Sequence, residues 1–386
     1  MRPFMGYRRP DGAVGARNHV VVLPAVSCAN GVVAAVAREV AGVVPLYHGH
    51  GCGRGGRDVA LHFRALAGLV GNPNVGAALI VGLGCEVVKA AYIADMCAGC
   101  GKPVEHFEIQ AVGGSRKAAA KGIALARSLL DSVAGDRRVE AGFEDLVLGL
   151  KCGGSDSMSG VTANPLVGEV TDRVVAAGGT AILTENTEMI GTSHILERRA
   201  RDAEVAARVR EMIEAADKRT HDIMGPLASL VIAPGNMEGG MSSIQEKSLG
   251  CIAKAGTSPV AGVVDYAEAP ATGGLVVMDG PGYDTESMTG LAAAGAQVMM
   301  FTTGRGNPIG YPIVPVIKIA SNTLLFNAME DDMDFDAEAS REGAGLSEAC
   351  DGLEELLLRV LDGELTASEV NRQDGIICLY TTHPAF

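Results

Sequence analysis

The stretch that decides the fold is HVVVLPAVSCANGVVAAVAREV, residues 19–40. Its first part, His19–Val26, is a short apolar run of the length of a buried strand, and its second part, Gly31–Val40, has the pattern of a helix. Between them lies a short turn that contains Cys28 and Asn30. The stretch therefore predicts a strand, a turn and a helix in succession.

The same unit recurs along the chain. The further strands that we expect before residue 200 are Gly42–Tyr47, Ala77–Val81, Val104–Gln110, Asp145–Leu150 and Thr180–Thr184. The helices expected after them are Val59–Val70, Val87–Cys97, Arg116–Val133, Leu166–Ala177 and Arg198–Lys218. Later strands are expected at Gly274–Met278, Ala296–Thr302 and Ile313–Ala320, and a last amphipathic helix at Leu346–Leu361.

Strands that alternate with helices at this spacing predict an α/β fold, with a doubly wound, mainly parallel sheet and helices on both faces. A segment rich in Gly, Ser and Pro, Met224–Gly256, breaks the alternation. Because domains usually contain ~100–200 residues, we expect two Rossmann-like α/β domains, residues 1–225 and 226–386. Aromatic residues make up only 4% of the chain, so aliphatic side chains must build the core.

Composition excludes several classes of protein. The formal net charge of -14 would repel phosphate backbones, so nucleic acid is not an expected partner. No apolar run approaches the ~20 residues that span a bilayer, and the N-terminus lacks the apolar region of a signal peptide. We therefore expect a cytoplasmic protein without a membrane partner. The nine cysteines should be reduced, so some are available as ligands.

Soft or ionisable side chains recur where the expected strands end. In an open parallel sheet, ligands bind beyond the carboxyl ends of the strands. These positions hold Cys28 and Asn30, then His48, His50 and Cys52, then Cys85 and Glu86, then Lys151 and Cys152, then Glu185 and Glu188. Any one cysteine could simply be a small core residue, but the flanking glycine and polar residues indicate exposed turns. Mixed His, Cys and Glu donors favour a divalent transition metal, without choosing between iron, manganese and zinc.

Other motifs are less specific. The loop Thr302–Gly306 follows an expected strand and offers hydroxyls and the Arg305 guanidinium, which suits a carboxylate clamp, although a charged surface loop is the alternative. Cys97 and Cys100 have the spacing of a zinc or redox pair, but no second pair completes a four-ligand site. Ser243 and Glu246 have the spacing of a helix capping box, a structural role.

Taken together, these loops carry a resemblance. The sequence resembles the catalytic region of the altronate and galactarate dehydratase family, which includes the large subunit of sulfolactate sulfo-lyase. The matching stretches are Gly6-Tyr7-Arg8-Arg9, Cys28-Ala29-Asn30, His48 with Gly51-Cys52, Gly82-Leu83-Gly84-Cys85-Glu86, Lys151-Cys152-Gly153-Gly154-Ser155-Asp156, Thr162-Ala163-Asn164-Pro165, Thr184-Glu185 with Glu188, Gly235-Asn236, Glu246-Lys247-Ser248-Leu249-Gly250 and Phe301-Thr302-Thr303-Gly304-Arg305-Gly306.

The resemblance implies a metal-dependent carbon–oxygen lyase, a hydro-lyase that removes water from a sugar acid or related hydroxy acid. A base removes the proton next to the carboxylate, and a metal stabilises the developing charge. Iron(II) is the expected ion, with manganese(II) as the alternative. The implied metal ligands are Cys28, His48, Cys52, Cys85 and Cys152. The implied catalytic residues are His48, Lys151, Glu188 and Lys247. The implied substrate-binding residues are Asn30, Ser155, Asn164, Thr302, Thr303 and Arg305.

The sequence departs from the family pattern in two places. Dehydratases of the family often carry a small domain before the first motif, whereas only five residues precede Gly6 here. We therefore expect a separate small subunit and a hetero-oligomer, as in the sulfo-lyase. The loop Asp334-Phe335-Asp336-Ala337-Glu338 also differs from the family's Asp-hydrophobic-Asn-Ala-Gly, so no role is assigned to it.

Three alternatives stay open. The first is a sulfolactate-type sulfo-lyase, in which the leaving group is sulfite instead of water. A dinucleotide-dependent oxidoreductase would share the fold class, but Gly49-His50-Gly51-Cys52-Gly53 does not have the pattern Gly-x-Gly-x-x-Gly after a first strand. The third alternative is a non-catalytic subunit or sensor of a lyase complex, which the intact stretch Lys151–Pro165 argues against.

Overall fold

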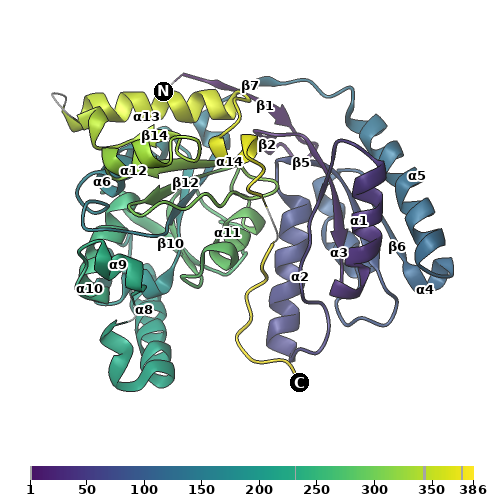
Figure 1. Cartoon of the computed structure of the whole chain (residues 1–386), viewed down its shortest axis with the longest axis horizontal. Helices are drawn as coiled ribbons and strands as arrows, with labels where there is room; N and C mark the ends of the chain where they lie inside the picture. Colours follow the sequence, from purple (N-terminus) through teal and green to yellow (C-terminus); the bar gives the residue numbers. More distant parts are fainter. Residues whose placement is uncertain (1, 231, 342–344, 375–376) are drawn as a thin grey trace.

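A computed structural model describes all residues except 1, 231, 342–344 and 375–376, and shows three sheets (Figure 1). The largest has seven strands in the order β10-β11-β9-β8-β12-β13-β14, and all neighbouring strands in it are parallel. Its strands are β8 (Val147–Cys152), β9 (Thr180–Leu183), β10 (Val260–Asp265), β11 (Gly274–Asp279), β12 (Val298–Thr303), β13 (Val316–Ala320) and β14 (Phe335–Asp336). The expected mainly parallel sheet is confirmed.

The second sheet is also parallel and has the order β4-β3-β5-β6. Its strands are β3 (His19–Pro24), β4 (Val43–Pro45), β5 (Val75–Gly82) and β6 (Val104–Glu108). The helices that follow them are α1 (Asn30–Glu39), α2 (Gly56–Gly71), α3 (Ala90–Met96), α4 (Ile109–Val112) and α5 (Ser115–Val133). A small antiparallel sheet of β1 (Phe4–Arg8), β2 (Val14–Gly15) and β7 (Val139–Ala141) lies beside both (Figure 1).

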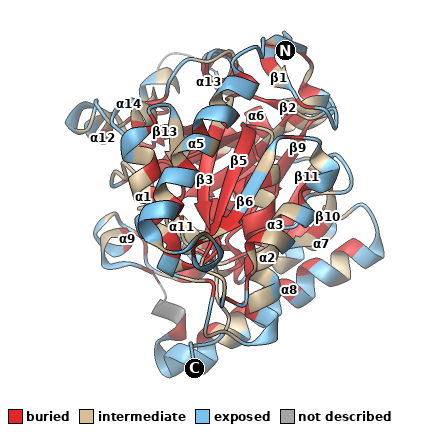
Figure 2. Ribbon diagram, turned by 90° about the vertical axis from the view of Figure 1, so that its right-hand side faces the viewer, coloured by how far each residue is buried: buried red, intermediate tan, exposed pale blue. Residues whose placement is uncertain are grey.

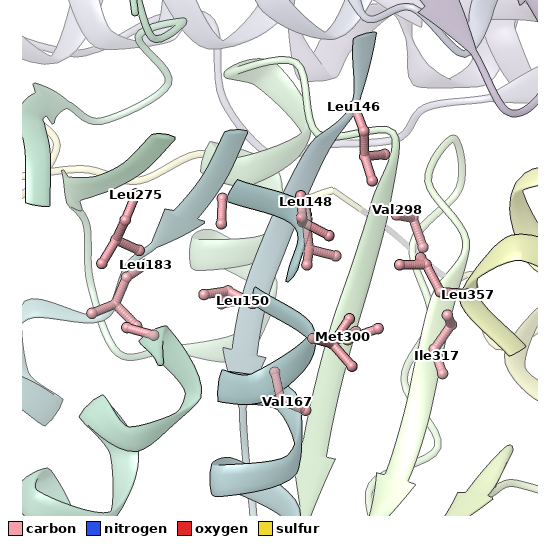
Figure 3. Close-up of a cluster of buried hydrophobic side chains, with 14 of the residues drawn as sticks. Leu146, Leu148, Leu150, Val167, Leu183, Leu275, Val298, Met300, Ile317 and Leu357 are labelled. Atoms are coloured by element: carbon pink, nitrogen blue, oxygen red, sulfur yellow. The ribbon is translucent and has the colours of Figure 1, made fainter. Parts of the chain in front are cut away.

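Apolar side chains on one face of the seven-stranded sheet form a core with α6 (Ala163–Ala176) and α13 (Leu346–Leu361). Figure 3 shows Leu148, Leu150 and Met300 of the strands beside Val167 of α6 and Leu357 of α13. All five are fully buried, and each such side chain stabilises the fold by about 1.5–3 kcal/mol. Because strand side chains alternate between faces, Lys151 and Phe301, the residues after Leu150 and Met300, face the other side.

That other face shares a core with the four-stranded sheet. The core includes Ile80 of β5, Leu66 of α2, Met299 of β12 and Leu291 of α11 (Asp284–Ala293). The helices α2 and α11 therefore lie between the two sheets (Figure 1). Figure 2 shows the buried strands enclosed by helices whose outer faces are exposed. Both sheets are covered on both faces, as expected for a doubly wound fold.

Within the described residues, the chain between β9 and β10 is an insertion that forms helices joined by loops and contains no named strand. It contains α7 (Ser193–Arg198), α8 (Ala203–Met224), α9 (Pro234–Glu238) and α10 (Ile244–Cys251). The helix expected at Arg198–Lys218 is interrupted, because the Asp202 side chain accepts a hydrogen bond from Val205 N and caps a new helix. The remaining helices, α12 (Thr323–Ala328) and α14 (Ala367–Val370), are short.

The two parallel sheets divide the chain at a different place from the expected boundary at residues 225 and 226. Strands β8 and β9 precede that boundary, yet they are hydrogen-bonded in the same sheet as β10–β14. The segment Met224–Gly256, where the boundary was expected, contains α9 and α10 and connects β9 to β10 of this sheet. The β8 strand, at the centre of this sheet, places the Lys151-Cys152 pair at the middle of its carboxyl edge.

Candidate active site

The loop after β9 folds back over the end of β8. Glu185, two residues beyond the end of β9, has a φ of 75°, a conformation that costs a non-glycine residue about 1–3 kcal/mol and that often occurs at functional sites. Its Oε2 accepts a hydrogen bond from Cys152 N at 3.2 Å. Gly153 leaves the room that this arrangement needs, because an added Cβ would lie 2.9 Å from Asp284 Oδ1.

Lys151 forms the centre of the polar cluster that results. Its Nζ donates to Glu185 Oε1, to the carbonyl oxygen of Cys152 at 2.7 Å and to Asp284 Oδ1 at 2.7 Å. The side chains of Lys151 and Glu185 are fully buried. Burial opposes the charge on Lys151, but Glu185 and Asp284 outweigh it and raise the pKa of the amine.

A second set of side chains reaches the cluster from α10 and from the turn that follows it, Ile252–Ala255. Lys247, Cys251 and Lys254 are spaced at helical intervals, so they lie on one side of this segment. Lys254 Nζ lies 2.8 Å from Cys152 Sγ and 3.3 Å from Glu185 Oε2. Cys251 Sγ lies 3.4 Å from Cys152 Sγ. Cys152 thus shares one buried site with residues 99 and 102 positions later in the sequence.

Glu188 joins the two sets. Its Oε2 lies 2.8 Å from Cys152 Sγ, and its Oε1 lies 2.5 Å from Lys247 Nζ. Burial favours the neutral form of Glu188, but Lys247, Lys254 and Lys151 outweigh it and hold the pKa of this carboxyl below its usual range. Burial, together with the charge of Glu188, raises the pKa of Glu185. Two adjacent carboxyls whose pKa values are pushed apart are typical of acid–base sites.

Cys152, Glu188 and Cys251 form a group whose ligand atoms are close enough together to hold a metal ion. One ligand atom from each lies within 4.8 Å of the others, and all three side chains are buried. Within the part of the chain that the structure describes, this is the one such group of three or more. Thiolate sulfur with a carboxylate oxygen suits a transition metal better than magnesium or calcium.

Of the five predicted metal ligands, only Cys152 belongs to this group. Cys28, Cys52 and Cys85 are exposed at the edge of the four-stranded sheet. His48 is buried and both its ring nitrogens are engaged, Nε2 with Pro24 O at 2.6 Å and Nδ1 with His50 N at 3.1 Å. The helices α2 and α11 lie between the two sheets, so the structure does not bring these residues to Cys152.

The predicted catalytic residues Lys151, Glu188 and Lys247 do meet in the cluster. Three of the six predicted substrate-binding residues instead hold loops in place. Thr302 Oγ1 donates to Asn164 Oδ1 at 2.7 Å, and Thr303 Oγ1 accepts from Gly306 N at 3.1 Å. These internal bonds shape the loops at the carboxyl edge of the sheet.

The other three predicted substrate-binding residues still have polar groups that could contact a ligand. Arg305 pairs with Glu238 at 2.8 Å on the surface. Ser155 Oγ and Asn30 Oδ1 are buried, and neither has a hydrogen-bond partner among the described residues. Ser155 lies in the loop after β8, whereas Asn30 begins α1 beside the four-stranded sheet.

Three cluster members were not singled out from the sequence: Cys251, Lys254 and Asp284. The helical spacing of Cys251 and Lys254 from Lys247 was the available signal for the first two. Asp284 begins α11 just beyond β11, at another strand end of the same sheet. Its Oδ2 accepts from Asn307 Nδ2 at 2.8 Å, and Asn307 lines a cavity of about 310 Å³ with Thr285 and Arg372.

Two family models match the chain. Residues 143–383 match the model described as D-galactarate/altronate dehydratase, C-terminal, and residues 6–134 match the one described as D-galactarate dehydratase/altronate hydrolase, second domain. The chain belongs to the D-galactarate/altronate dehydratase family. It is therefore an enzyme of the lyase class, and the resemblance noted in the sequence is confirmed. The border between the matched regions coincides with the division between the two parallel sheets.

Individual relatives agree. Altronate dehydratase of Bacillus subtilis is 37% identical over 389 residues, which cover 96% of this chain and 76% of the relative. Subunit beta of (2R)-sulfolactate sulfo-lyase of Chromohalobacter salexigens is 37% identical over 375 residues, or 95% of each chain. Galactarate dehydratase (L-threo-forming) of Escherichia coli is 35% identical over 358 residues, which cover 86% of this chain and 68% of the relative. None of the described helices has the length and apolar character needed to cross a membrane.

Proposed function

We propose that this family member removes water from a sugar acid by β-elimination at the Lys151 cluster. The observation that supports this most directly is the meeting of Lys151, Lys247 and Lys254 with Glu185 and Glu188 at the carboxyl edge of a parallel sheet. Elimination from a hydroxy acid needs a proton acceptor, a proton donor and positive charge that stabilises the developing anion. The cluster contains all three in a buried setting, where electrostatic interactions are strong.

The cluster suggests a division of roles. In the reaction, a base takes the proton from the carbon next to the carboxylate, a carbon–carbon double bond forms, and the β-hydroxyl leaves with a proton as water. We assign proton removal to Glu188 and proton donation to Lys247, whose side chain is 13% exposed and so lies at the edge of the cluster. Lys151 and Lys254 are fixed charges that stabilise the anion. The product enol then rearranges to a 2-keto acid.

We further propose that Cys152, Cys251 and the Oε2 atom of Glu188 hold a divalent transition metal, with iron(II) expected and manganese(II) as the alternative. When bound, the ion would act as a Lewis acid that lowers the energy of the charged transition state. The close approach of the two sulfur atoms, 3.4 Å, and the mixed donors support this assignment. The predicted loop with His48 and Cys52 stays a second proposal for the metal site. The metal content of cysteine variants tests both proposals.

We propose that the substrate reaches the cluster from the cavity beside Asp284. This side chain is 26% exposed and touches Lys151 on one side and Asn307, which lines the cavity of about 310 Å³, on the other. That volume lies within the range of small-molecule sites. Arg372 also lines the cavity and would pair with a carboxylate. The predicted carboxylate contact of Arg305 stays a proposal as well.

The test is an assay of the purified protein under anaerobic conditions, with iron(II), manganese(II) or chelator, against a panel of sugar acids. We expect 2-keto acid formation with metal, and a loss of at least about a hundredfold in Glu188→Gln and Lys247→Met. The exposed variant Lys218→Met is the matched control and should keep full activity. Equal turnover by all four proteins would exclude the cluster as the active site.

A sulfo-lyase activity is the second candidate, because the chain matches 95% of a relative that is named as a sulfo-lyase subunit. Sulfite release from sulfolactate, in place of water release from sugar acids, would decide for it.

We also propose that the chain works with a separate small subunit, because the same relative is named as a subunit. Turnover that appears only when a small protein encoded nearby is added would support this, and full turnover by the isolated chain would contradict it.

A further inference from the structure

A second cavity lies at the same carboxyl edge of the large sheet, beyond the ends of β10 and β11. Its volume is about 170 Å³. Three of its lining residues are arginines, Arg57 and Arg64 of α2 and Arg219 of α8. A concentration of arginine in a chain with a net charge of -14 is unusual, and nothing in the proposed elimination uses these residues.

Two of the three guanidinium groups form no ion pair with a described residue. Neither Arg57 nor Arg219 has a hydrogen bond or ion pair with any residue that the structure describes. Arg64, in contrast, is fixed in place, because its NH1 donates to Tyr266 O at 3.2 Å and lies 3.6 Å from Asp265 Oδ2. The cavity therefore has one anchored cation and two whose donors remain free.

Two carboxylates, Asp265 and Asp279, also line the cavity, so its three arginines outnumber them by one. Asp265 pairs with Arg64, and Asp279 Oδ1 accepts a hydrogen bond from Asn186 Nδ2. Tyr380 forms another wall and packs on Tyr266, with the ring centroids 5.3 Å apart. Burial raises the pKa of Tyr380, and the charges of Arg219 and Arg57 oppose that rise. Both guanidinium groups therefore lie near the same hydroxyl.

We propose that this cavity is a binding site for a small oxyanion, a carboxylate or phosphate group, separate from the Lys151 cluster. Arginine presents a planar set of donors that matches both groups in a bidentate manner. Because Arg57 belongs to α2 beside the four-stranded sheet and Arg219 to α8 beside the seven-stranded one, the anion is held from both units. Its binding stabilises their docking.

Calorimetric titration of the full chain tests the proposal, with inorganic phosphate in one arm and tartrate, a small hydroxy-dicarboxylate, in the other. We expect saturable binding of at least one anion, and a Kd that is about tenfold higher or more in the double variant Arg57→Gln/Arg219→Gln. The control Arg54→Gln should leave the Kd unchanged, because Arg54 bonds to His383 O and does not line the cavity. Lys247→Met should also keep the binding, which separates this site from the cluster.

If the double variant does not fold, Arg57→Lys/Arg219→Lys replaces it, because it keeps the charges and removes only the bidentate geometry. It should weaken binding by severalfold. The absence of saturable binding of both anions to the unaltered protein would overturn the proposal. An unchanged Kd in the folded double variant would overturn it as well.

Discussion

The ammonium group of Lys254 lies 2.8 Å from the sulfur of Cys152, and both side chains are buried. The lysine comes from the turn after α10 and the cysteine from the end of β8. The contact therefore fastens the helical insertion to the centre of the large sheet. It also places a positive charge beside one of the proposed metal ligands.

Replacement of Lys254 by methionine should therefore damage both stability and activity. Glu185 Oε2, 3.3 Å away, would lose a buried partner, and removal of one member of a buried pair typically costs about 3–5 kcal/mol. We expect urea unfolding to show a loss of this order. Lys218→Met is the control, because Lys218 pairs with Asp222 on the surface, where such pairs contribute about 0–1 kcal/mol. Equal stability of the two variants would contradict the prediction.

Lys318 should show the opposite behaviour. Its Nζ is buried 3.4 Å above the Phe301 ring, and it has no hydrogen-bond partner among the described residues. Burial holds the pKa of this amine well below its usual range, so folding disfavours its charged form. Lys318→Met should raise the free energy of unfolding by about 1–3 kcal/mol, because it removes an unsatisfied buried group.

The pH dependence of the free energy of unfolding provides a further check on the Lys318→Met prediction. In the unfolded chain Lys318 keeps its proton up to a pKa of about 10.4, whereas the folded chain releases this proton at a lower pH. The stability of the unaltered protein therefore rises with pH in this range, and the advantage of Lys318→Met should shrink toward alkaline pH. Lys151→Met, which breaks the pair with Glu185, should lower stability. A destabilised Lys318→Met would show that the amine has a partner in solution.

Metal content should depend on the cluster. We expect Cys152→Ser and Cys251→Ser to lose most of the bound transition metal, because each removes one of the three grouped ligands. Cys52→Ser should keep it, because Cys52 is exposed near the other sheet. Elemental analysis of the anaerobically purified variants provides the measurement. Loss of metal in Cys52→Ser alone would favour the loop with His48 over the cluster.

Buried histidine should make the fold sensitive to acid. Burial lowers the pKa of His48 to about 4, against the hydrogen bond to Pro24 O. Since histidine in the unfolded chain has a pKa of about 6.5, the unfolded state binds more protons between these values, and stability falls as pH decreases from about 6.5 to 4. His48→Gln should make this fall less steep in urea titrations. His106→Gln, at an exposed position, should leave the slope unaltered.

The sequence predicted most of the elements that build the large sheet, and it singled out Lys151, Cys152, Glu188 and Lys247 of the candidate cluster. The expected strand Asp145–Leu150 became β8, and Lys151 and Glu188 meet beyond the strand ends as expected. Local patterns suffice here, because the alternation of strand and helix fixes which residues end each parallel strand. The strand β10 was not expected, since Gly262 and a register shift interrupt its pattern.

What the sequence by itself determined is therefore the parallel α/β fold and the position of Lys151 and Cys152 at a strand end. Only the tertiary structure decided which thiol lies beside Cys152: Cys251 from the insertion, and not Cys28, Cys52 or Cys85. The physical reason is that the hydrophobic periodicity of a sequence shows only on which side of its own helix or strand a residue lies. Which residues from different elements come into contact depends on how those elements pack. Here α2 and α11 pack between the two sheets and keep their edges apart.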